Sequence, residues 1–474
     1  MRIAWRAALF AVALFFLYFY GLADAGLIGP DEPRYASIGR EMAQRGDWVT
    51  PRLWGEPWFE KPALEYWGIA LAYKLGFGDD WAPRIFNASL SIAFLGFFAW
   101  VLRRLYSGEI AFVATAILAT SIGWVAESRT AVMDLPLAAS FGAAMVTALA
   151  GWLPLAGIFL GVAMLAKGLV PVVLALPAVW FFRKDFRGLA AAALGCLVVA
   201  GPWYAAMLLR HGTSFFNEFI LKHHFSRFTE TALQHPQPVW FFIPVLLAGL
   251  FPWTPLVAML RIQKDDAFLW SWFGFGFLFF SLSSNKLPGY ALPLLPPLSI
   301  LIAKAILSSA RAWAWLAGCG LLLGLTPLVG FILPEALAHG LSRVSFSTAP
   351  IAPAILIAVG AAAVGAWRGF PAVLATAVVC YGLILARMER FDYYASARPT
   401  WRAIANRKDQ VCVESLHRAW QYGLNFYAGT PLVLCETELR PIRLRQQGSR
   451  PPEILLEPQI GSPVPEASPD PGAF

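Results

Sequence analysis

The chain consists mainly of long apolar runs separated by short polar junctions. A helix needs about 20 apolar residues to cross the hydrocarbon core of a bilayer, and many runs reach or approach that length. We predict about thirteen membrane spans, near 3–24, 83–105, 108–126, 131–150, 152–166, 169–182, 187–209, 239–260, 268–283, 287–305, 311–333, 350–367 and 369–387. Several are short for a full crossing. The pattern predicts an all-α, polytopic membrane protein.

Two polar loops and the C-terminal region interrupt this pattern. We take residues 1–387 as the membrane domain, with long loops at 25–82 and 210–238. In the first loop, Tyr35, Ile38 and Met42 recur at helical spacing before Gly46, which predicts a short amphipathic helix at the membrane interface. The apolar, aromatic stretch 63–77 predicts a second interfacial or re-entrant helix, and Phe215, Phe216, Phe219 and Ile220 suggest another in loop 210–238.

The region after residue 388 is more polar. Strand-like runs at Val411–Glu414 and Pro431–Cys435 flank a helical segment from Leu416 to Tyr427, so residues 388–450 are expected to form a small α/β domain. Seven prolines among the last 24 residues predict a disordered tail over 451–474. Cys412 and Cys435 lie in this region, and the sequence leaves open whether they form a disulfide.

The distribution of charge gives an orientation. Basic residues occupy alternate junctions: Arg2/Arg6, Arg103/Arg104, Arg183/Lys184/Arg187, Arg261/Lys264, Lys304/Arg311 and Arg368. Because short cytoplasmic loops are enriched in Lys and Arg, the N-terminus is expected inside. The loops 25–82 and 210–238 and the C-terminal region then lie outside, which predicts a bacterial inner-membrane protein with its long loops in the periplasm.

Composition narrows the function classes. The chain is 58% hydrophobic and only 14% charged, and it contains 20 tryptophans, which excludes an ordinary soluble protein. The net charge of +8 arises from the basic junctions and the tail. No nucleic-acid-binding motif accompanies it, so we expect no nucleic-acid partner.

Three short acidic-basic clusters fall on the predicted outer face: Asp31-Glu32-Pro33-Arg34, Glu60-Lys61-Pro62 and Met133-Asp134-Leu135-Pro136. Their gathering beside the lipid suits an enzyme that acts on a lipid-linked polar substrate. A carboxylate can activate or orient an acceptor hydroxyl, and a guanidinium fork suits a phosphate. The alternatives are helix capping by Asp31 and Asp134 and a solvated turn at Glu60 and Lys61.

Further polar residues lie at the same predicted face. Lys167 and Lys286 either neutralise a phosphate or extend from helix ends towards water, and Tyr290 lies four residues after Lys286. His223, His224 and Arg227 fall in loop 210–238. One of these histidines could join Glu60 in coordinating a divalent ion, and a solvated histidine pair is the alternative.

The order of these motifs is similar to that of a known family. The run GPDEPRYASIGREMAQRGDWVTPRLWGEPWFEKPALEYW resembles the first periplasmic loop of ArnT-like transferases. Further matches are ESRTAVMDLPL, AKG at 166–168, HFSRF at 224–228 and SSNKLPGYALPLLPPL. These transferases belong to the polytopic, polyprenyl-phosphate-sugar-dependent glycosyltransferases of GT-C type, which include protein O-mannosyltransferases. The resemblance covers about residues 1–305, and the later part matches in layout only.

The resemblance implies transfer of a sugar from an undecaprenyl-phosphate carrier to a periplasmic acceptor, such as lipid A, another glycan or a protein. It makes Asp31 and Asp134 the acidic catalytic pair. It makes Arg34, Lys61, Lys167 and Arg227 ligands of the carrier phosphate, which Tyr290 contacts. It places a divalent ion at Glu60 with His223 or His224, and no organic cofactor is expected.

Other functions share part of this pattern. A lipid-linked glycan flippase or transporter could have a similar number of spans, but it is expected to carry ionisable groups near mid-membrane and an internal repeat. This chain keeps its charges at the outer helix ends, which favours an enzyme. A glycan ligase or polymerase is a closer alternative, and the sequence identifies neither the sugar nor the acceptor.

Overall fold

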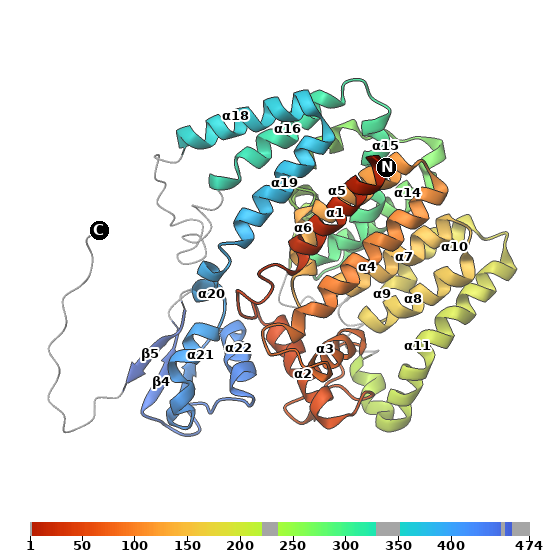
Figure 1. Ribbon diagram of the computed structural model, residues 1–474. Coiled ribbons are helices and arrows are strands. Elements are labelled where there is room, and N and C mark those ends of the chain that lie inside the picture. The colour runs from red at the N-terminus through yellow and green to blue at the C-terminus, as the bar shows by residue number, and fades with distance from the viewer. Residues whose placement is uncertain (1, 220–235, 329–350, 447–450, 457–474) are drawn as a thin grey trace.

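A computed structural model describes residues 2–219, 236–328, 351–446 and 451–456. These residues are mostly helical, as predicted, and the helices pack side by side in a bundle (Figure 1). The helices of the N-terminal half are α1 (Arg2–Phe19), α2 (Asp31–Arg45), α3 (Leu64–Lys74), α4 (Ala82–Leu105), α5 (Gly108–Thr120), α6 (Ile122–Ser128), α7 (Asp134–Leu149), α8 (Leu153–Lys167), α9 (Val170–Leu174), α10 (Leu176–Phe181) and α11 (Phe186–Phe215).

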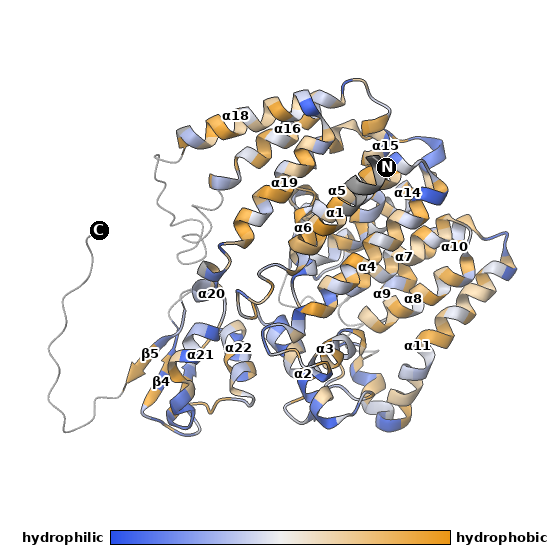
Figure 2. Ribbon diagram, in the orientation of Figure 1, coloured by the Kyte–Doolittle hydropathy of each residue, from blue (hydrophilic) through white to orange (hydrophobic). Residues whose placement is uncertain are grey.

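The second half of the bundle contains shorter elements. They are η2 (Val239–Phe241), α13 (Phe242–Gly249), η3 (Thr254–Met259), η4 (Lys264–Asp266), α14 (Ala267–Leu282), η5 (Pro288–Leu294), α15 (Leu295–Leu307), α16 (Ala312–Gly324), α18 (Ile351–Arg368) and α19 (Phe370–Leu385). Apolar residues dominate these helices, and hydrophilic positions concentrate at helix ends, in loops and on α2 (Figure 2).

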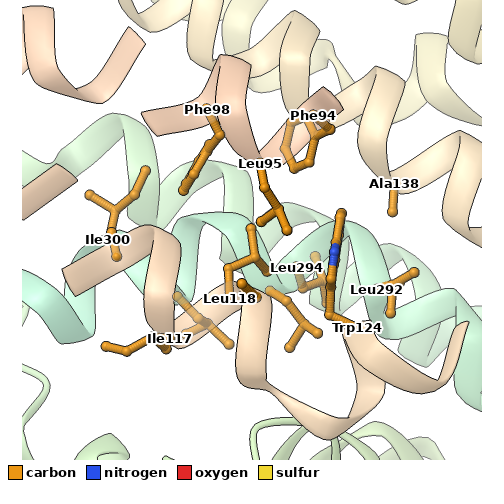
Figure 3. Packing of buried hydrophobic residues seen from close by; sticks show 14 of the residues in the cluster. Phe94, Leu95, Phe98, Ile117, Leu118, Trp124, Ala138, Leu292, Leu294 and Ile300 are labelled. Atoms are coloured by element: carbon orange, nitrogen blue, oxygen red, sulfur yellow. The ribbon is translucent and has the colours of Figure 1, made fainter. Parts of the chain in front are cut away.

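Side chains from helices far apart in sequence form the core of the bundle. Phe94 of α4 packs against Trp124 of α6, with ring centroids 5.3 Å apart (Figure 3). The Trp124 indole donates a hydrogen bond to Ser91 of α4, so its one polar atom is satisfied inside the core. The Tyr18 hydroxyl of α1 donates to the backbone carbonyl of Ala119. These contacts fix α1, α4, α5 and α6 relative to one another.

Several predicted spans are broken rather than continuous. The run 169–182 divides into α9 and α10, and Pro177 lies at the start of α10, where it lacks the N–H that a continuous helix would need. The run 239–260 divides into η2, α13 and η3. The run 108–126 bends by 63° between α5 and α6. Ser121 is extended there, and the Ile122 N–H donates to Phe251 instead of continuing α5.

Three described helices are long and apolar enough to cross a membrane: Ala82–Leu105, Phe186–Phe219 and Pro288–Leu307. The bent pair α5 and α6 makes a fourth if it forms one span, and eight further apolar helices have 10 to 17 residues. The described part of the chain is therefore a helical integral membrane protein. The predicted number of thirteen spans is not established by these helices.

The first loop contains both helices that the sequence predicts. The amphipathic helix is α2, and Gly46 ends it in the left-handed conformation, with a φ of 71°. The second is α3, which packs against α2. Between them, β1 (Arg52–Leu53) and β2 (Glu56–Pro57) form a short antiparallel hairpin, which the sequence analysis did not predict.

A small mixed α/β unit follows the membrane helices. It comprises α20 (Glu389–Ala395), α21 (Arg398–Ile404), η7 (Ala405–Gln410), β3 (Val411–Ser415), α22 (Arg418–Ala428), β4 (Ile442–Arg445) and β5 (Glu453–Leu456). Strands β3, β4 and β5 form one sheet in that order, with β3 and β4 parallel and β5 antiparallel. Cys412 and Cys435 form a disulfide, which the sequence had left open.

Two expectations for this unit were wrong. The run Pro431–Cys435 contributes an isolated bridge between Leu434 and Val413 instead of a strand. Disorder was expected from Pro451 onward, but Glu453–Leu456 is strand β5. The four residues after Pro452 carry no proline, and they pair along the edge of β4. The rest of the proline-rich tail, 457–474, lies outside the described residues.

Candidate active site

Asp31 and Arg34 form an ion pair at the start of α2. The Arg34 Nη2 donates to Asp31 Oδ1 at 2.6 Å. Asp31 is the first residue of the helix and follows Pro30, and no side chain caps this helix end. The capping alternative for Asp31 is therefore wrong. Its side chain stays 39% exposed, so the carboxylate remains open to a substrate.

Glu60 and Lys61 lie beside the same guanidinium. Arg34 Nη2 is 3.5 Å from Glu60 Oε2, and Lys61 Nζ is 3.5 Å from Glu60 Oε1. Each of these three side chains is only 11–13% exposed, which excludes the solvated-turn alternative for Glu60 and Lys61. The sequence-predicted residues Asp31, Arg34, Glu60 and Lys61 thus form one mixed-charge cluster, which we call the Arg34 cluster.

The Arg34 guanidinium stays positively charged. Burial by itself would lower its pKa, but Tyr35, Glu60 and Asp31 raise the pKa above its ordinary value. The guanidinium also lies over the aromatic rings of Tyr35, Trp58 and Tyr422, at 5.2, 5.3 and 5.7 Å from the ring centroids. These rings stabilise a desolvated cation through their negative faces.

A second ion pair joins α7 and α8. Asp134 is the first residue of α7, where no side-chain capping bond forms, so the capping alternative is wrong for Asp134 as well. Its Oδ1 instead accepts a hydrogen bond from Lys167 Nζ at the end of α8. The Lys167 ammonium lies 4.0 Å from the ring centroid of Tyr290 in η5. Asp134, Lys167 and Tyr290 form what we call the Lys167 cluster.

Gly289 allows η5 to approach this cluster closely. A Cβ atom added at Gly289 would lie 2.8 Å from Asp134 Cγ and 2.9 Å from Asp134 Oδ2. Carbon atoms do not come this close without displacement, so any larger residue here would shift η5 or the Asp134 side chain. The neighbouring Tyr290 ring thereby reaches the Asp134–Lys167 pair.

A single buried carboxylate connects the two clusters. Glu32 follows Asp31, and its Oε1 accepts a hydrogen bond of 2.7 Å from the backbone N–H of Ala131. Its Oε2 accepts from the backbone N–H of Ile28 at 2.7 Å, and the Arg84 guanidinium of α4 donates to both carboxylate oxygens. Ala131 lies three residues before Asp134. Glu32 therefore holds the start of α2 next to the segment that leads into α7.

The buried side chain of Asn87 supports the same segment from α4. Its Nδ2 donates to the backbone carbonyls of Thr130 and Val132, at 2.7 and 2.9 Å, and to Glu65 of α3. Asn87 therefore fixes the backbone that leads into α7, next to the contact that Glu32 makes at Ala131.

The remaining predicted residues are placed differently. Lys286 is buried, and its ammonium donates to the backbone carbonyls of Ser283 and Gln237, so its described hydrogen bonds are to the backbone and not to the acids of either cluster. His223, His224 and Arg227 lie outside the described residues. Within the described residues, no group of three or more His, Cys, Asp and Glu side chains could hold a metal ion. The neighbours of the Glu60 carboxylate are the cationic groups of Arg34 and Lys61, which cannot act as metal ligands.

Sequence reasoning missed three residues of this region. Arg84 lies inside an apolar run and Glu32 was counted only as part of an acid pair, yet the two form the buried link between the clusters. An arginine within a predicted span was the available signal, because such residues are rare without a role. Tyr422 reaches Arg34 from the C-terminal unit, and no local pattern distinguishes it.

A cavity of about 460 Å³ lies between α2 and the C-terminal unit. Its lining includes Arg40, Glu41 and Arg45 of α2, Trp54 of the hairpin turn, and Gly429–Pro431 after α22. Arg40 donates a hydrogen bond to the backbone carbonyl of Phe426, and Arg45 donates one to the Glu41 carboxylate. Charged side chains of α2 and the ring of Trp54 both line the cavity, and the Trp54 ring contacts Tyr422.

Known proteins resemble the chain in both sequence and fold. Residues 3–210 match the family model described as dolichyl-phosphate-mannose-protein mannosyltransferase. An undecaprenyl phosphate-alpha-4-amino-4-deoxy-L-arabinose arabinosyl transferase of Yersinia pestis is 34% identical over 327 residues, which are 63% of this chain and 58% of the relative. A transferase of the same description from Pseudomonas fluorescens is 32% identical over 336 residues, which are 65% of this chain and 57% of the relative.

Solved structures extend the similarity over most of the chain. The crystal structure of ArnT from Cupriavidus metallidurans bound to undecaprenyl phosphate has a TM-score of 0.72 and 26% identity, and covers 92% of this chain and 86% of that one. The apo structure of the same protein has a TM-score of 0.73 and covers 91% and 86%. The chain matches less than two thirds of the length of the curated relatives. In sequence and in fold the chain is similar to ArnT, as the motifs predicted.

Proposed function

We propose that this protein transfers a sugar from an undecaprenyl-phosphate carrier to an acceptor at the outer face of the membrane. The main support for the proposal is the buried Glu32 carboxylate. Its hydrogen bond to Ala131 holds the Asp31–Arg34 pair of α2 next to the Asp134–Lys167 pair between α7 and α8. The ArnT structure with bound undecaprenyl phosphate supports the identity of the carrier, because its fold matches this chain over most of its length.

The cations of both clusters would stabilise the departing phosphate. As the bond between the sugar C1 and the phosphate oxygen breaks, negative charge grows on the phosphate. Arg34, Lys61 and Lys167 hold positive charges in surroundings with little water, where such charges interact more strongly than in bulk solvent. Tyr290 lies against Lys167 and would contact the same phosphate. Arg227 and Lys286 are proposed as further phosphate ligands.

The carboxylates would act on the acceptor. Asp31 is the more exposed of the two acids, so it is suited to receive the proton of an acceptor hydroxyl. Asp134 is paired with Lys167 and would hold that ammonium in place. A single displacement at C1 would invert the anomeric configuration. If the acceptor is a lipid A phosphate, which is already anionic, no base is needed and Asp31 would position it.

The topology and location belong to the same proposal. Thirteen spans over residues 1–387 put α2, α3 and the C-terminal unit in the periplasm of a bacterial inner membrane. The Cys412–Cys435 disulfide supports that side, because disulfides persist in oxidising compartments. The acceptor would be lipid A, another glycan or a protein.

A divalent ion at Glu60 with His223 or His224 remains a prediction. Glu60 already lies 3.5 Å from both Arg34 and Lys61, so a metal there would have to share its carboxylate with two cations. Dialysis against a chelator, followed by a transfer assay with and without added Zn²⁺ or Mn²⁺, tests this. A metal-dependent enzyme loses transfer on dialysis and regains it with the ion, whereas unchanged transfer contradicts the prediction.

The direct test supplies the purified protein in lipid with a panel of polyprenyl-phosphate sugars and acceptor lipids, glycans and peptides. Wild-type protein should transfer at least one sugar, with release of the polyprenyl phosphate. Asp31→Asn should abolish transfer. The matched control is Asp409→Asn, whose side chain is exposed in η7 of the C-terminal unit; it should remain active. Absence of transfer from every donor, or full activity of Asp31→Asn, would overturn the proposal.

A further inference from the structure

The C-terminal unit contributes an aromatic ring to the Arg34 cluster. Tyr422 lies on α22, which packs against α2 (Figure 1). Its ring centroid is 5.7 Å from the Arg34 guanidinium carbon, and Trp58 faces the same group at 5.3 Å. A residue almost 390 positions later in the chain therefore forms part of the surroundings of a proposed phosphate ligand.

Tyr422 is held in place by a second ring. Trp54 stacks on it with the centroids 5.7 Å apart and the planes 20° from parallel. Trp54 has a φ of +55° and Gly55 a φ of +91°, in the two-residue turn between β1 and β2. A two-residue hairpin turn of type I′ requires positive φ at both positions, which Asn and Gly adopt easily and a bulky aromatic residue does not. Such backbone strain clusters at functional sites.

Fixed polar contacts dock the C-terminal unit on the first loop. Arg40 of α2 donates to the backbone carbonyl of Phe426 at 2.7 Å, and the Tyr427 hydroxyl donates to Asp80. The buried Arg398 pairs with Asp80 at 3.0 Å and donates to the backbone carbonyl of Ala23. These contacts come from α2, from the backbone just before the first loop and from the end of that loop, so the position of α22 relative to Arg34 is determined from several sides.

Two polar donors beside these rings have no hydrogen-bond acceptor within the described part of the chain. They are Arg34 Nε and Trp58 Nε1, and both atoms are buried. A buried donor without an acceptor is destabilising. An oxygen atom of a bound phosphate or sugar would satisfy both groups, while Nη2 of Arg34 keeps its bond to Asp31.

We propose that Tyr422 is a positioning residue for Arg34, and that the C-terminal unit is therefore part of the donor-phosphate site. This inference rests on the proposed function, in which Arg34 binds the carrier phosphate. The Tyr422 ring supports the face of the guanidinium, so that Nε and its neighbours point towards the phosphate. Trp54 fixes the ring through the strained turn.

The test measures equilibrium binding of undecaprenyl phosphate to the full-length protein in lipid nanodiscs. Tyr422→Leu keeps an apolar side chain of similar bulk but removes the aromatic face. It should weaken binding about 3- to 30-fold, the range expected for a partly desolvated cation–π contact. Tyr422→Phe keeps the ring and should bind within about twofold of wild type. Gln421→Ala, at the adjacent position of α22, is the matched control and should bind as wild type does.

A double-mutant cycle separates positioning from general stability. With Arg34→Lys, which removes the planar guanidinium, the further change Tyr422→Leu should weaken binding by less than it does in wild type, because the ring acts through that guanidinium. Equal binding by Tyr422→Leu and wild type, or additive effects in the cycle, would overturn the inference. If wild-type protein fails to bind undecaprenyl phosphate, the proposed function fails instead.

Discussion

The Glu32 carboxylate and the Arg84 guanidinium form a buried ion pair with two hydrogen bonds, Nη2 to Oε2 at 2.7 Å and Nε to Oε1 at 2.9 Å. Glu32 is 1% exposed and Arg84 is 3% exposed. Arg84 also donates to the backbone carbonyls of Leu22, Ala25 and Gly26. Removal of either partner would destabilise the fold, because the remaining charge would be buried without an opposite charge beside it.

Glu32→Gln should therefore destabilise the protein. The change leaves Arg84 charged, buried and without its counter-ion, and breaking a buried pair in this way lowers the free energy of unfolding by about 3–5 kcal/mol. Unfolding by SDS titration in mixed micelles measures the change. Transfer activity should fall as well, because the single amide oxygen of glutamine can accept from the N–H of Ala131 or of Ile28 but not from both, as the carboxylate does.

The control for this variant is Glu438→Gln. Glu438 pairs with Arg440 on the surface of the C-terminal unit, and its side chain is 60% exposed. Exposed pairs contribute little to stability, so its unfolding curve should match that of wild type. Equal stability of Glu32→Gln and wild type would show that the pair does not hold the two clusters together.

Gly289→Ala should impair catalysis without unfolding the protein. The new Cβ would come within 2.8 Å of Asp134 Cγ, so either η5 or the Asp134 carboxylate must move. Displacement of a catalytic group by about 1 Å can lower kcat about 100-fold. Steady-state transfer kinetics measure the loss. The control is Gly274→Ala in α14, where an added Cβ has no atom within 4 Å, and this variant should keep wild-type rates. If Gly289→Ala is as active as wild type, the assigned role of Asp134 is contradicted.

Removal of the disulfide should loosen the C-terminal unit. Cys412 and Cys435 are 23 residues apart, and closing a loop of this size stabilises a fold by about 3 kcal/mol. The double variant Cys412→Ala, Cys435→Ala should show faster hydrogen exchange in β3 and α22, while exchange in α4 stays unchanged. Cys380→Ala, which removes a free cysteine, should have no such effect. Unchanged exchange in the double variant would show that the bond adds little.

The sequence predicts the parts of the fold that depend on local periodicity. Tyr35, Ile38 and Met42 mark the buried face of α2, and Gly46 marks its end, because both signals lie within a few residues. Span continuity was less predictable. Pro177 breaks one apolar run, but the bend at Ser121 depends on a backbone bond to Phe251, which lies 130 residues away in sequence and follows no local pattern.

The same distinction holds for the site. Asp31, Arg34, Glu60 and Lys61 lie within 31 positions of one another on adjoining elements, and their grouping was predicted. The role of Glu32 was not, because its partners Arg84 and Ala131 come from two other segments. Tyr422 could not be predicted from sequence at all, since its approach to Arg34 depends on how the C-terminal unit docks.

We propose that the cations of the two clusters bind one carrier phosphate. Equilibrium binding of undecaprenyl phosphate to Lys61→Gln, Lys167→Gln and Lys74→Gln tests it most directly. Lys74 is the control, since it is exposed in the last turn of α3. We expect the first two variants each to bind about tenfold more weakly, in line with the loss of a charge-assisted contact, and Lys74→Gln to bind as wild type does. Equal binding by all three variants would contradict it.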